Sequence, residues 1–381
     1  MTGQTVAPRV ATAVGESLPE RIWYGDGLGA RAARAALVPG SLVFGAAVAA
    51  RGLLYDRGWL PSARVEAPVV SVGGLRVGGA GKTPMVLWLA KRLRRQGLRV
   101  CLVTRGYGRR TSTSTPFLLG WDPHNTDLAE SVVAMAGRAG DEATLLLLRS
   151  GCRVVVGSDR VAACRTAFRE MAAAGGAPDL FLLDDGFQHR ALDRVFDIVM
   201  VDGCESSQRL LPAGPLRESV AALERAHAVV AVVAPSANIE QGIDLLSTPR
   251  WQFRAEVLAE GLVSLPTDTQ VEALAALRGA RVVAVAGIAR PRRFLDEMAR
   301  AGANIVGVCV RPDHHWYGPS DVAEIRALAA AADFVVTTEK DLVKLATTEL
   351  GAPLRGLRIE MDVRDAEVLL APILALRSFD H

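Results

Sequence analysis

The chain has few cysteines, and their spacing excludes the common patterns of a structural metal site or a disulfide-rich fold. No Cys-X-X-Cys occurs, the number is odd, and several of them lie inside apolar segments. The five are Cys101, Cys152, Cys164, Cys204 and Cys309. We therefore expect reduced thiols packed in a protein core, as in a cytosolic compartment.

The chain also lacks an excess of charge of either sign. It contains 44 Lys and Arg against 41 Asp and Glu, which gives a net charge of +3. A dedicated nucleic-acid binder usually carries a strongly basic face, so this balance argues against nucleic acid as a partner. Half of the residues are hydrophobic and 22% are charged, which is typical of a folded globular protein, and 381 residues suit two domains.

A secretory signal is missing from the N-terminal segment, because its first 20 residues lack a basic start followed by an apolar core. Residues 35–50 form an uncharged run of 16 residues, short of the roughly 20 that a spanning helix needs, and Pro39-Gly40 interrupts it. Arginines and aromatic residues flank the run: Arg31, Arg34, Arg51, Arg57, Arg64, Trp23, Tyr24, Tyr55 and Trp59. This combination predicts an interfacial helical segment at residues 1–65, although an Ala-rich helix packed on the core would have the same composition.

Short apolar runs that alternate with helix-like stretches dominate the sequence from residue 68 onward. The strands that this pattern predicts are residues 69–72, 100–104, 153–156, 180–183, 198–201 and 229–233. Continuous apolar runs are typical of parallel strands buried on both faces. Their alternation with helices, such as residues 85–96 and 160–173, predicts a doubly wound parallel α/β sheet at residues 66–245.

The pattern changes after residue 235. Residues 251–257 and 261–265 have the composition of a strand pair, so we expect a two-stranded linker at residues 246–266. A second α/β series follows, with strands at 282–286, 305–308 and 334–337 and helices at 291–301 and 320–332. This series predicts a smaller Rossmann-like α/β domain at residues 267–381, with a C-terminal helix that returns toward the first domain.

A glycine-rich loop, Arg76-Val-Gly-Gly-Ala-Gly-Lys-Thr83, joins the first predicted strand to a helix. A strand, a glycine loop and a Gly-Lys-Thr that opens a helix form the context of a phosphate-binding P-loop. Glycines let backbone N–H groups approach the phosphates of ATP, Lys82 would bridge the β- and γ-phosphates, and Thr83 would bind Mg²⁺. The predicted nucleotide-binding residues are Arg76, Val77, Gly78, Gly79, Ala80, Gly81, Lys82 and Thr83, with Arg76 where the motif usually has Gly.

Acidic residues lie at the end of one predicted strand and in one predicted loop. Asp184 and Asp185 end one strand, at the edge where α/β sheets bind ligands, and are candidates for Mg²⁺ coordination or for an Asp-Asp-Gly turn. Asp141, in Gly140-Asp-Glu142, either caps an apolar helix or supplies a catalytic base. The residues alone leave Asp141, Asp184 and Glu218 as alternatives for the base that accepts a proton from an attacking hydroxyl.

Two histidines have neighbours that suggest chemistry. His314 follows Asp313 in a predicted loop of the second domain, and His189 follows Phe187 and Gln188. If the loop faces the cleft between the domains, His314 gains an acid–base or charge-pair role.

Together and in order, these motifs resemble the tetraacyldisaccharide 4′-kinase family, the lipid A 4′-kinases of Gram-negative bacteria. The glycine loop alone is generic, but the ordered set is specific and spans most of the chain. The motifs are Ser71-Val-Gly-Gly-Leu-Arg-Val-Gly-Gly-Ala-Gly-Lys-Thr-Pro84, Thr104-Arg-Gly-Tyr-Gly108, Gly140-Asp-Glu142, Val155-Val-Gly-Ser-Asp-Arg160, Asp184-Asp-Gly-Phe-Gln-His189, Leu211-Pro-Ala-Gly-Pro-Leu-Arg-Glu218, Ala286-Gly-Ile288, Arg290-Pro291, Phe294, Pro312-Asp-His314 and Thr337-Thr-Glu-Lys-Asp341. Gly74, Arg76 and Ala143 depart from the usual family residues, which affects loop detail and removes no catalytic group.

The resemblance implies two α/β/α sandwich domains, the first P-loop NTPase-like, and an N-terminal helix on the cytoplasmic face of the bacterial inner membrane. It implies transfer of the γ-phosphate of ATP, with Mg²⁺, to the 4′-hydroxyl of a tetraacylated glucosamine disaccharide 1-phosphate, the lipid A precursor. It also implies that Asp141 and His314 form a catalytic dyad, in which we expect Asp141 to accept the proton. Further matching active-site positions are Asp184, Asp185, Gln188, Glu218, Arg105 and Arg217. We expect a peripheral monomer.

Two other functions fit the glycine loop when the resemblance is set aside. One is a membrane-associated P-loop ATPase that switches partners on hydrolysis, and the other is a P-loop kinase or ligase of a soluble metabolite. The first would hydrolyse ATP without a lipid acceptor. The second would be indifferent to detergent and lipid.

Overall fold

A computed structural model describes residues 18–79, 81–111, 113–120, 128–205, 208–233, 251–265 and 271–376. Its strands are β1 (Val69–Gly74), β2 (Val100–Thr104), β3 (Phe117–Leu119), β4 (Arg153–Val156), β5 (Leu180–Asp184), β6 (Phe196–Val201), β7 (Ala228–Val233), β8 (Trp251–Val263), β9 (Arg281–Ala286), β10 (Asn304–Val310), β11 (Phe334–Thr338) and β12 (Leu354–Val363). Its α-helices are α2 (Leu18–Tyr24), α3 (Leu28–Asp56), α4 (Lys82–Arg95), α5 (Leu128–Ala139), α6 (Asp141–Ser150), α7 (Arg160–Ala173), α8 (Pro291–Arg300), α9 (Pro319–Ala329), α10 (Glu339–Leu345) and α11 (Ala366–Ala375). The described strands join in one sheet of 12, in the order β10-β9-β11-β12-β8-β7-β6-β1-β5-β2-β4-β3.

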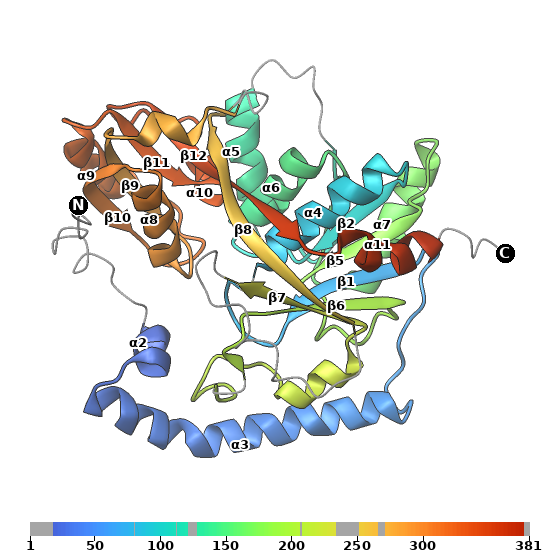
Figure 1. The fold of residues 1–381 in the computed structure, drawn as a ribbon. Coiled ribbons are helices and arrows are strands. Elements are labelled where there is room, and N and C mark those ends of the chain that lie inside the picture. The colour runs from blue at the N-terminus through green and yellow to red at the C-terminus, as the bar shows by residue number, and fades with distance from the viewer. Residues whose placement is uncertain are drawn as a thin grey trace.

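The first α/β unit, which comprises β1–β7 and α4–α7, is a parallel sheet with helices on both faces (Figure 1). The strands β7-β6-β1-β5-β2-β4 run parallel, and β3 adds an antiparallel edge. Every residue of β1, β2, β5 and β6 is buried, as expected for continuous apolar runs. The predicted doubly wound parallel α/β sheet is therefore confirmed.

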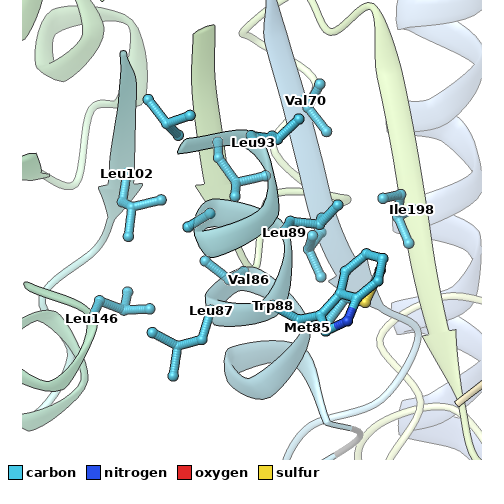
Figure 2. Packing of buried hydrophobic residues seen from close by; sticks show 14 of the residues in the cluster. Val70, Met85, Val86, Leu87, Trp88, Leu89, Leu93, Leu102, Leu146 and Ile198 are labelled. Carbon is cyan, nitrogen blue, oxygen red and sulfur yellow. The ribbon is translucent and has the colours of Figure 1, made fainter. Parts of the chain in front are cut away.

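Helix α4 holds the glycine loop to this sheet through its apolar side. Figure 2 shows Met85, Leu89 and Leu93 of α4 in the same buried cluster as Val70 of β1 and Ile198 of β6. The C-terminal helix α11 joins the same cluster through three leucine and isoleucine side chains, Leu369, Leu370 and Ile373. Helix α7 packs on the opposite face of the sheet. The loop that follows β1 is thus fixed to the most buried part of the molecule.

The second α/β unit, which comprises β9–β11 with α8 and α9, is a smaller parallel sheet. Strand β9 pairs in parallel with both β10 and β11. Helix α8 covers one face of this sheet and α9 the other, each with its own apolar cluster. The ends of β9 and β10 that precede the residue 287–290 and 311–315 loops point toward the first unit, where the first loop approaches the glycine loop and the second approaches Gly108.

A long antiparallel ribbon of β8 and β12 joins the two units. The expected strand pair within residues 251–265 is wrong, because this segment is one strand of 13 residues whose antiparallel partner is β12. The gap between the two expected strands contains a β-bulge at Glu260, since Arg358 pairs with Gly261 and Ile359 with Ala259. We propose that this ribbon marks the boundary between the two domains.

The N-terminal segment forms α2 and the helix α3, which has 29 residues and lies along the lower side of the molecule in Figure 1. The expected interruption at Pro39-Gly40 is wrong, because α3 continues through Pro39. A proline within a helix removes one backbone hydrogen bond, but the helix continues on both sides of Pro39. By length and composition α3 is apolar enough to cross a membrane.

Helix α3 touches the rest of the protein along a narrow stripe. Its buried residue Ser41 donates a hydrogen bond to the carbonyl oxygen of Leu210 at 2.9 Å and accepts one from the backbone N–H of Ala213 at 3.0 Å. Leu42 and Val43 are 70% and 71% exposed. The alternative of an Ala-rich helix packed in the core is therefore wrong, since 6% of the most apolar window of α3 is buried.

The cysteines are free thiols, as predicted. Four of them are buried, whereas Cys204 is exposed in the loop that follows β6. Burial raises the pKa of Cys164 to about 12, so that thiol stays protonated and unreactive.

Candidate active site

The glycine loop, residues 76–83, leaves the end of β1 and opens α4. Gly78 and Gly81 have φ angles of 87° and 80°, in the left-handed region where a side chain is strained. Gly81 is the residue that precedes the first turn of α4, so the N-terminus of this helix points into the loop. The predicted position Ala80 lies outside the described residues. A loop of this shape, followed by a helix N-terminus, suits an anion.

Lys82 is held at the loop by an acidic residue from the neighbouring strand. Its Nζ donates to Oδ1 of Asp185 at 2.8 Å, and Arg217 donates to both oxygens of the same carboxylate at 2.7 and 2.8 Å. Burial raises the pKa of Asp185, but the charges of Lys82 and Arg217 outweigh it and hold the pKa below its usual range. Asp185 therefore acts as a charged bridge between a lysine and an arginine.

Asp184 lies in a different environment from Asp185, although the two are adjacent. In the part of the chain that the structure describes, nothing donates a hydrogen bond to its buried carboxylate. Burial, followed by the charges of Glu142 and Asp185, raises the pKa of Asp184 to about 7. Asp184 and Thr83 line the same cleft. A buried carboxylate without a partner suits a cation, and its pairing with one hydroxyl fits Mg²⁺ that takes its other ligands from phosphate and water.

Among the described residues, no group of three or more His, Cys, Asp or Glu side chains is arranged to hold a metal ion.

Asp141 and His314 meet across the two α/β units. Asp141 is the first residue of α6 and is 1% exposed, and its Oδ1 lies 2.8 Å from Nδ1 of His314. Its Oδ2 accepts a hydrogen bond from Nζ of Lys344 at 3.2 Å. Burial raises the pKa of Asp141, but the hydrogen bond from His314 and the charges of Lys340 and Lys344 lower it below its usual range. The carboxylate is thus ionised and fully engaged.

The other ring nitrogen of His314 faces the cleft. Nε2 lies 3.4 Å from Nζ of Lys340 and 3.6 Å from Oδ2 of Asp313. Lys340 in turn donates to Oε1 of Glu142 at 3.0 Å. All four of these residues line the cleft, whereas Asp141 lies behind them. A neutral His314 that donates from Nδ1 to Asp141 therefore directs the lone pair at Nε2 toward the cleft, where Nζ of Lys340 is the neighbouring donor.

One cleft of about 2180 Å³ connects these groups. It runs from the N-terminal helices past the glycine loop to the second unit, and residues that mark its course are Trp23, Tyr24, Arg34, Lys82, Thr83, Asp184, Arg217, Arg290 and His314. Arginines are frequent along its walls, which suits a ligand with several negative charges.

The remaining predicted residues have different surroundings. Arg105 is exposed and lines the cleft, and Gln188 lines it while its Nε2 donates to the carbonyl oxygen of Gly74 at 3.0 Å. Val77 and Gly79 also line the cleft. Glu218 does not: it is 8% exposed and accepts a hydrogen bond from Arg225 at 2.7 Å, so the expected substrate contact is not supported.

Arg76 belongs to the glycine loop, and its side chain is bound to residues of two other segments. It is 3% exposed and forms hydrogen bonds with Asp202 and with the hydroxyl of Tyr24 in α2. Asp202 follows β6, the strand beside β1. The sequence analysis missed Asp202, although an acidic residue at the end of a predicted strand is the same signal that identified Asp184.

Lys344 and Asp341 were also missed as part of the site. Lys344 lies between the carboxylates of Asp141 and Asp341, at 3.2 and 2.8 Å. Both residues come from α10, which begins in the quoted motif Thr337-Thr-Glu-Lys-Asp341. The motif thus contributes Lys340 to the cleft and a supporting pair beneath Asp141.

The chain is similar to proteins of one kind along most of its length. The model of the family described as tetraacyldisaccharide-1-P 4′-kinase matches residues 33–376. A tetraacyldisaccharide 4′-kinase of an Anaeromyxobacter species is 38% identical over 94% of this chain and 96% of its own, and one of Geobacter sulfurreducens is 38% identical over 84% and 86%. Among solved structures, an "apo" form of LpxK from Aquifex aeolicus in complex with ATP has a TM-score of 0.70 and 28% identity, over 90% of this chain and 99% of that one.

We predict that Gly108→Ala separates His314 from Asp141. A Cβ at Gly108 would lie 2.9 Å from Nδ1 of His314, so the ring must move. The measurement is the downfield proton resonance of Nδ1, which we expect in the wild-type chain and not in Gly108→Ala.

Gly97→Ala is the matched control for this change. Gly97 also has a positive φ, of 82°, but a Cβ there would meet nothing within 4 Å. Both substitutions should therefore cost about 1–2 kcal/mol of backbone strain, and only Gly108→Ala should lose the resonance. An unchanged resonance in Gly108→Ala would show that the ring does not depend on this contact.

Proposed function

The chain belongs to the tetraacyldisaccharide-1-P 4′-kinase family, and from this we propose that it transfers the γ-phosphate of ATP to the 4′-hydroxyl of a tetraacylated glucosamine disaccharide 1-phosphate in lipid A biosynthesis. The observation that supports this most directly is the cleft. It joins the glycine loop, the Asp141–His314 pair and the N-terminal helices in one continuous space. A kinase with a lipid acceptor needs these three parts together: a triphosphate site, a base and access from a bilayer.

The glycine loop and its neighbours would hold the nucleotide. Backbone N–H groups of the loop and the N-terminus of α4 would bind the phosphates, and Lys82 would exchange Asp185 for a phosphate oxygen. Thr83 and Asp184 would hold Mg²⁺, which supplies charge neutralisation at the transferring phosphoryl group. Asp185, with both oxygens already bound, would position Lys82 and Arg217 instead of binding the metal.

The Asp141–His314 pair would accept the proton of the attacking hydroxyl. Because Asp141 lies behind His314 and has both oxygens engaged, the geometry favours Nε2 of His314 as the atom that takes the proton. Asp141 would then fix the ring tautomer and stabilise the imidazolium that forms. This reverses our sequence-based expectation that Asp141 itself is the acceptor.

The N-terminal helices would bring the acceptor to this base. Leu42 and Val43 give α3 an exposed apolar face, and arginines flank it. Such a helix suits the headgroup layer of the inner membrane, with its apolar side toward the acyl chains. The cleft begins beside α2 and α3, so a lipid whose acyl chains stay in the bilayer would enter the cleft headgroup first.

The transfer reaction itself tests the proposal. Full-length protein in detergent, with Mg²⁺, γ-labelled ATP and tetraacylated disaccharide 1-phosphate, should give a labelled lipid whose new phosphate is at the 4′ position by mass spectrometry. Asp184→Asn should raise the Mg²⁺ concentration needed for the half-maximal rate, because a metal ligand is lost. ATP hydrolysis without lipid labelling would support an ATPase switch, and labelling of a soluble acceptor regardless of detergent would support a metabolite kinase.

A double-mutant cycle tests the proposed dyad. Asp141→Asn and His314→Asn should each lower kcat by about 10²- to 10⁴-fold, and the double variant should be little worse than either, because the two residues act as one unit. The KM for ATP should change by less than about threefold if the dyad serves only the chemical step.

The neighbouring pair His315–Asp321 is the control for this cycle. Its Nε2 to Oδ2 distance is also 2.8 Å, but neither residue lines the cleft. His315→Asn should leave kcat close to the wild-type value. Near-wild-type turnover of Asp141→Asn or His314→Asn would refute the dyad.

Vesicle binding tests the membrane role of α3. Changing Leu42 and Val43 together to Ser should lower partitioning to phosphatidylethanolamine–phosphatidylglycerol vesicles by at least about tenfold, since burial of each side chain contributes about 1.5–3 kcal/mol when complete. Val306→Ser, at a residue of β10 that is 46% exposed, should leave partitioning unchanged. Equal partitioning of all three proteins in a co-sedimentation assay would rule out α3 as the membrane contact.

A further inference from the structure

Arg290 of the second unit lies directly over the glycine loop. It follows β9 and immediately precedes α8. A Cβ placed on Gly78 would be 3.6 Å from Cβ of Ala289, and one placed on Gly79 would be 4.0 Å from Cδ of Arg290. The side chains of residues 289 and 290 therefore border the space that a side chain on either glycine would occupy, beside the turn that would curl around the phosphates.

The guanidinium of Arg290 is bound to a carboxylate that has a second arginine. Nη2 donates to Oδ2 of Asp202 at 2.8 Å, and Arg76 donates to the same oxygen. The side chain of Arg76 is 3% exposed, whereas that of Arg290 is 36% exposed and lines the cleft. Asp202 would thus keep a buried partner if Arg290 left it for another anion.

Two cations of the first unit share one carboxylate near the loop. Lys82 and Arg217 share the carboxylate of Asp185, and Arg217 also donates to the carbonyl oxygen of Gly74 at 3.0 Å. On the side of the second unit, Arg293 has its pKa lowered by burial and then by the charge of Arg290. This side of the cleft holds more positive charge than its acidic residues offset. A bound anion would reduce the repulsion between these positive charges.

We propose that Arg290 is a catalytic arginine that the second unit supplies to the transferring phosphoryl group. The inference rests on the proposed kinase function. As the bond from the acceptor oxygen to the γ-phosphorus forms and the bond from that phosphorus to the leaving oxygen of ADP breaks, the acceptor proton passes to His314. Arg290 leaves Asp202 and donates to the oxygens on which negative charge is then greatest.

A purely structural role for Arg290 makes a different prediction. If its only function were to tie the second unit to Asp202, then removal of either partner would have the same effect. Asp202→Asn keeps an acceptor for Arg76 and releases Arg290. It should therefore retain most of the activity if Arg290 acts on the phosphoryl group, and it should match Arg290→Ala if the ion pair is what matters.

Nucleotide affinities test the proposal without any lipid acceptor. ADP with Mg²⁺ and aluminium fluoride mimics the planar transferring phosphoryl group, and ADP with Mg²⁺ alone does not. Arg290→Ala should bind the mimic about 100-fold more weakly than the wild-type chain and bind ADP within about threefold. Arg290→Lys should bind the mimic with an affinity between those of the wild-type chain and Arg290→Ala, because lysine keeps the charge but lacks the planar pair of donors.

Arg281→Ala is the matched control, since Arg281 is an exposed arginine at the opposite end of β9 and pairs with Asp333. It should bind both ligands like the wild-type chain. Three results would each overturn the proposal. Arg290→Ala could lose affinity for ADP and for the mimic equally, or the wild-type chain could bind both with equal affinity. The third is an Asp202→Asn variant with the same loss as Arg290→Ala. The affinity measurement contains no lipid acceptor, so a negative result would refute the role of Arg290 without refuting the proposed kinase function. A negative transfer assay would refute the kinase function without changing the measured affinities.

Discussion

The hydrogen bond between Asp141 and His314 is the constraint on which the site depends. It joins residues 173 positions apart, one at the start of α6 and the other in the loop after β10. A carboxylate that is 1% exposed must have partners, and both of its side-chain partners, His314 and Lys344, come from the C-terminal part of the chain. Burial of this aspartate in the first unit therefore depends on contacts with the C-terminal part of the chain.

A related arrangement recurs on either side of the glycine loop. The strands β5 and β6 flank β1, and each is followed by an acidic residue that binds two cations. Asp185 binds Lys82 and Arg217, and Asp202 binds Arg76 and Arg290. Carboxylates thus offset the positive charge that a triphosphate would otherwise neutralise. A nucleotide would compete for the same donors, so binding would exchange internal ion pairs for contacts with phosphate.

The parts of this account that could be predicted from sequence are those with a local signal. The continuous apolar runs of the first unit predicted its parallel strands within a few residues, but the antiparallel edge strand β3 was not predicted. The glycine loop and Asp184 followed from their positions at strand ends. The pairing of β8 with β12 could not be predicted, because it joins segments about a hundred residues apart and the bulge at Glu260 lies in the gap between the two expected strands. The surroundings of Glu218 could not be predicted either, because a motif fixes the order of residues and does not reveal an ion pair such as that with Arg225.

A structure of the chain with ADP, Mg²⁺, aluminium fluoride and the disaccharide acceptor would test the central claim most directly. The account predicts that the acceptor hydroxyl lies within hydrogen-bond distance of Nε2 of His314, while Nδ1 remains bound to Asp141. An acceptor hydroxyl bound to Asp184 or Glu142 instead, or a His314 that has left Asp141 in the complex, would contradict it.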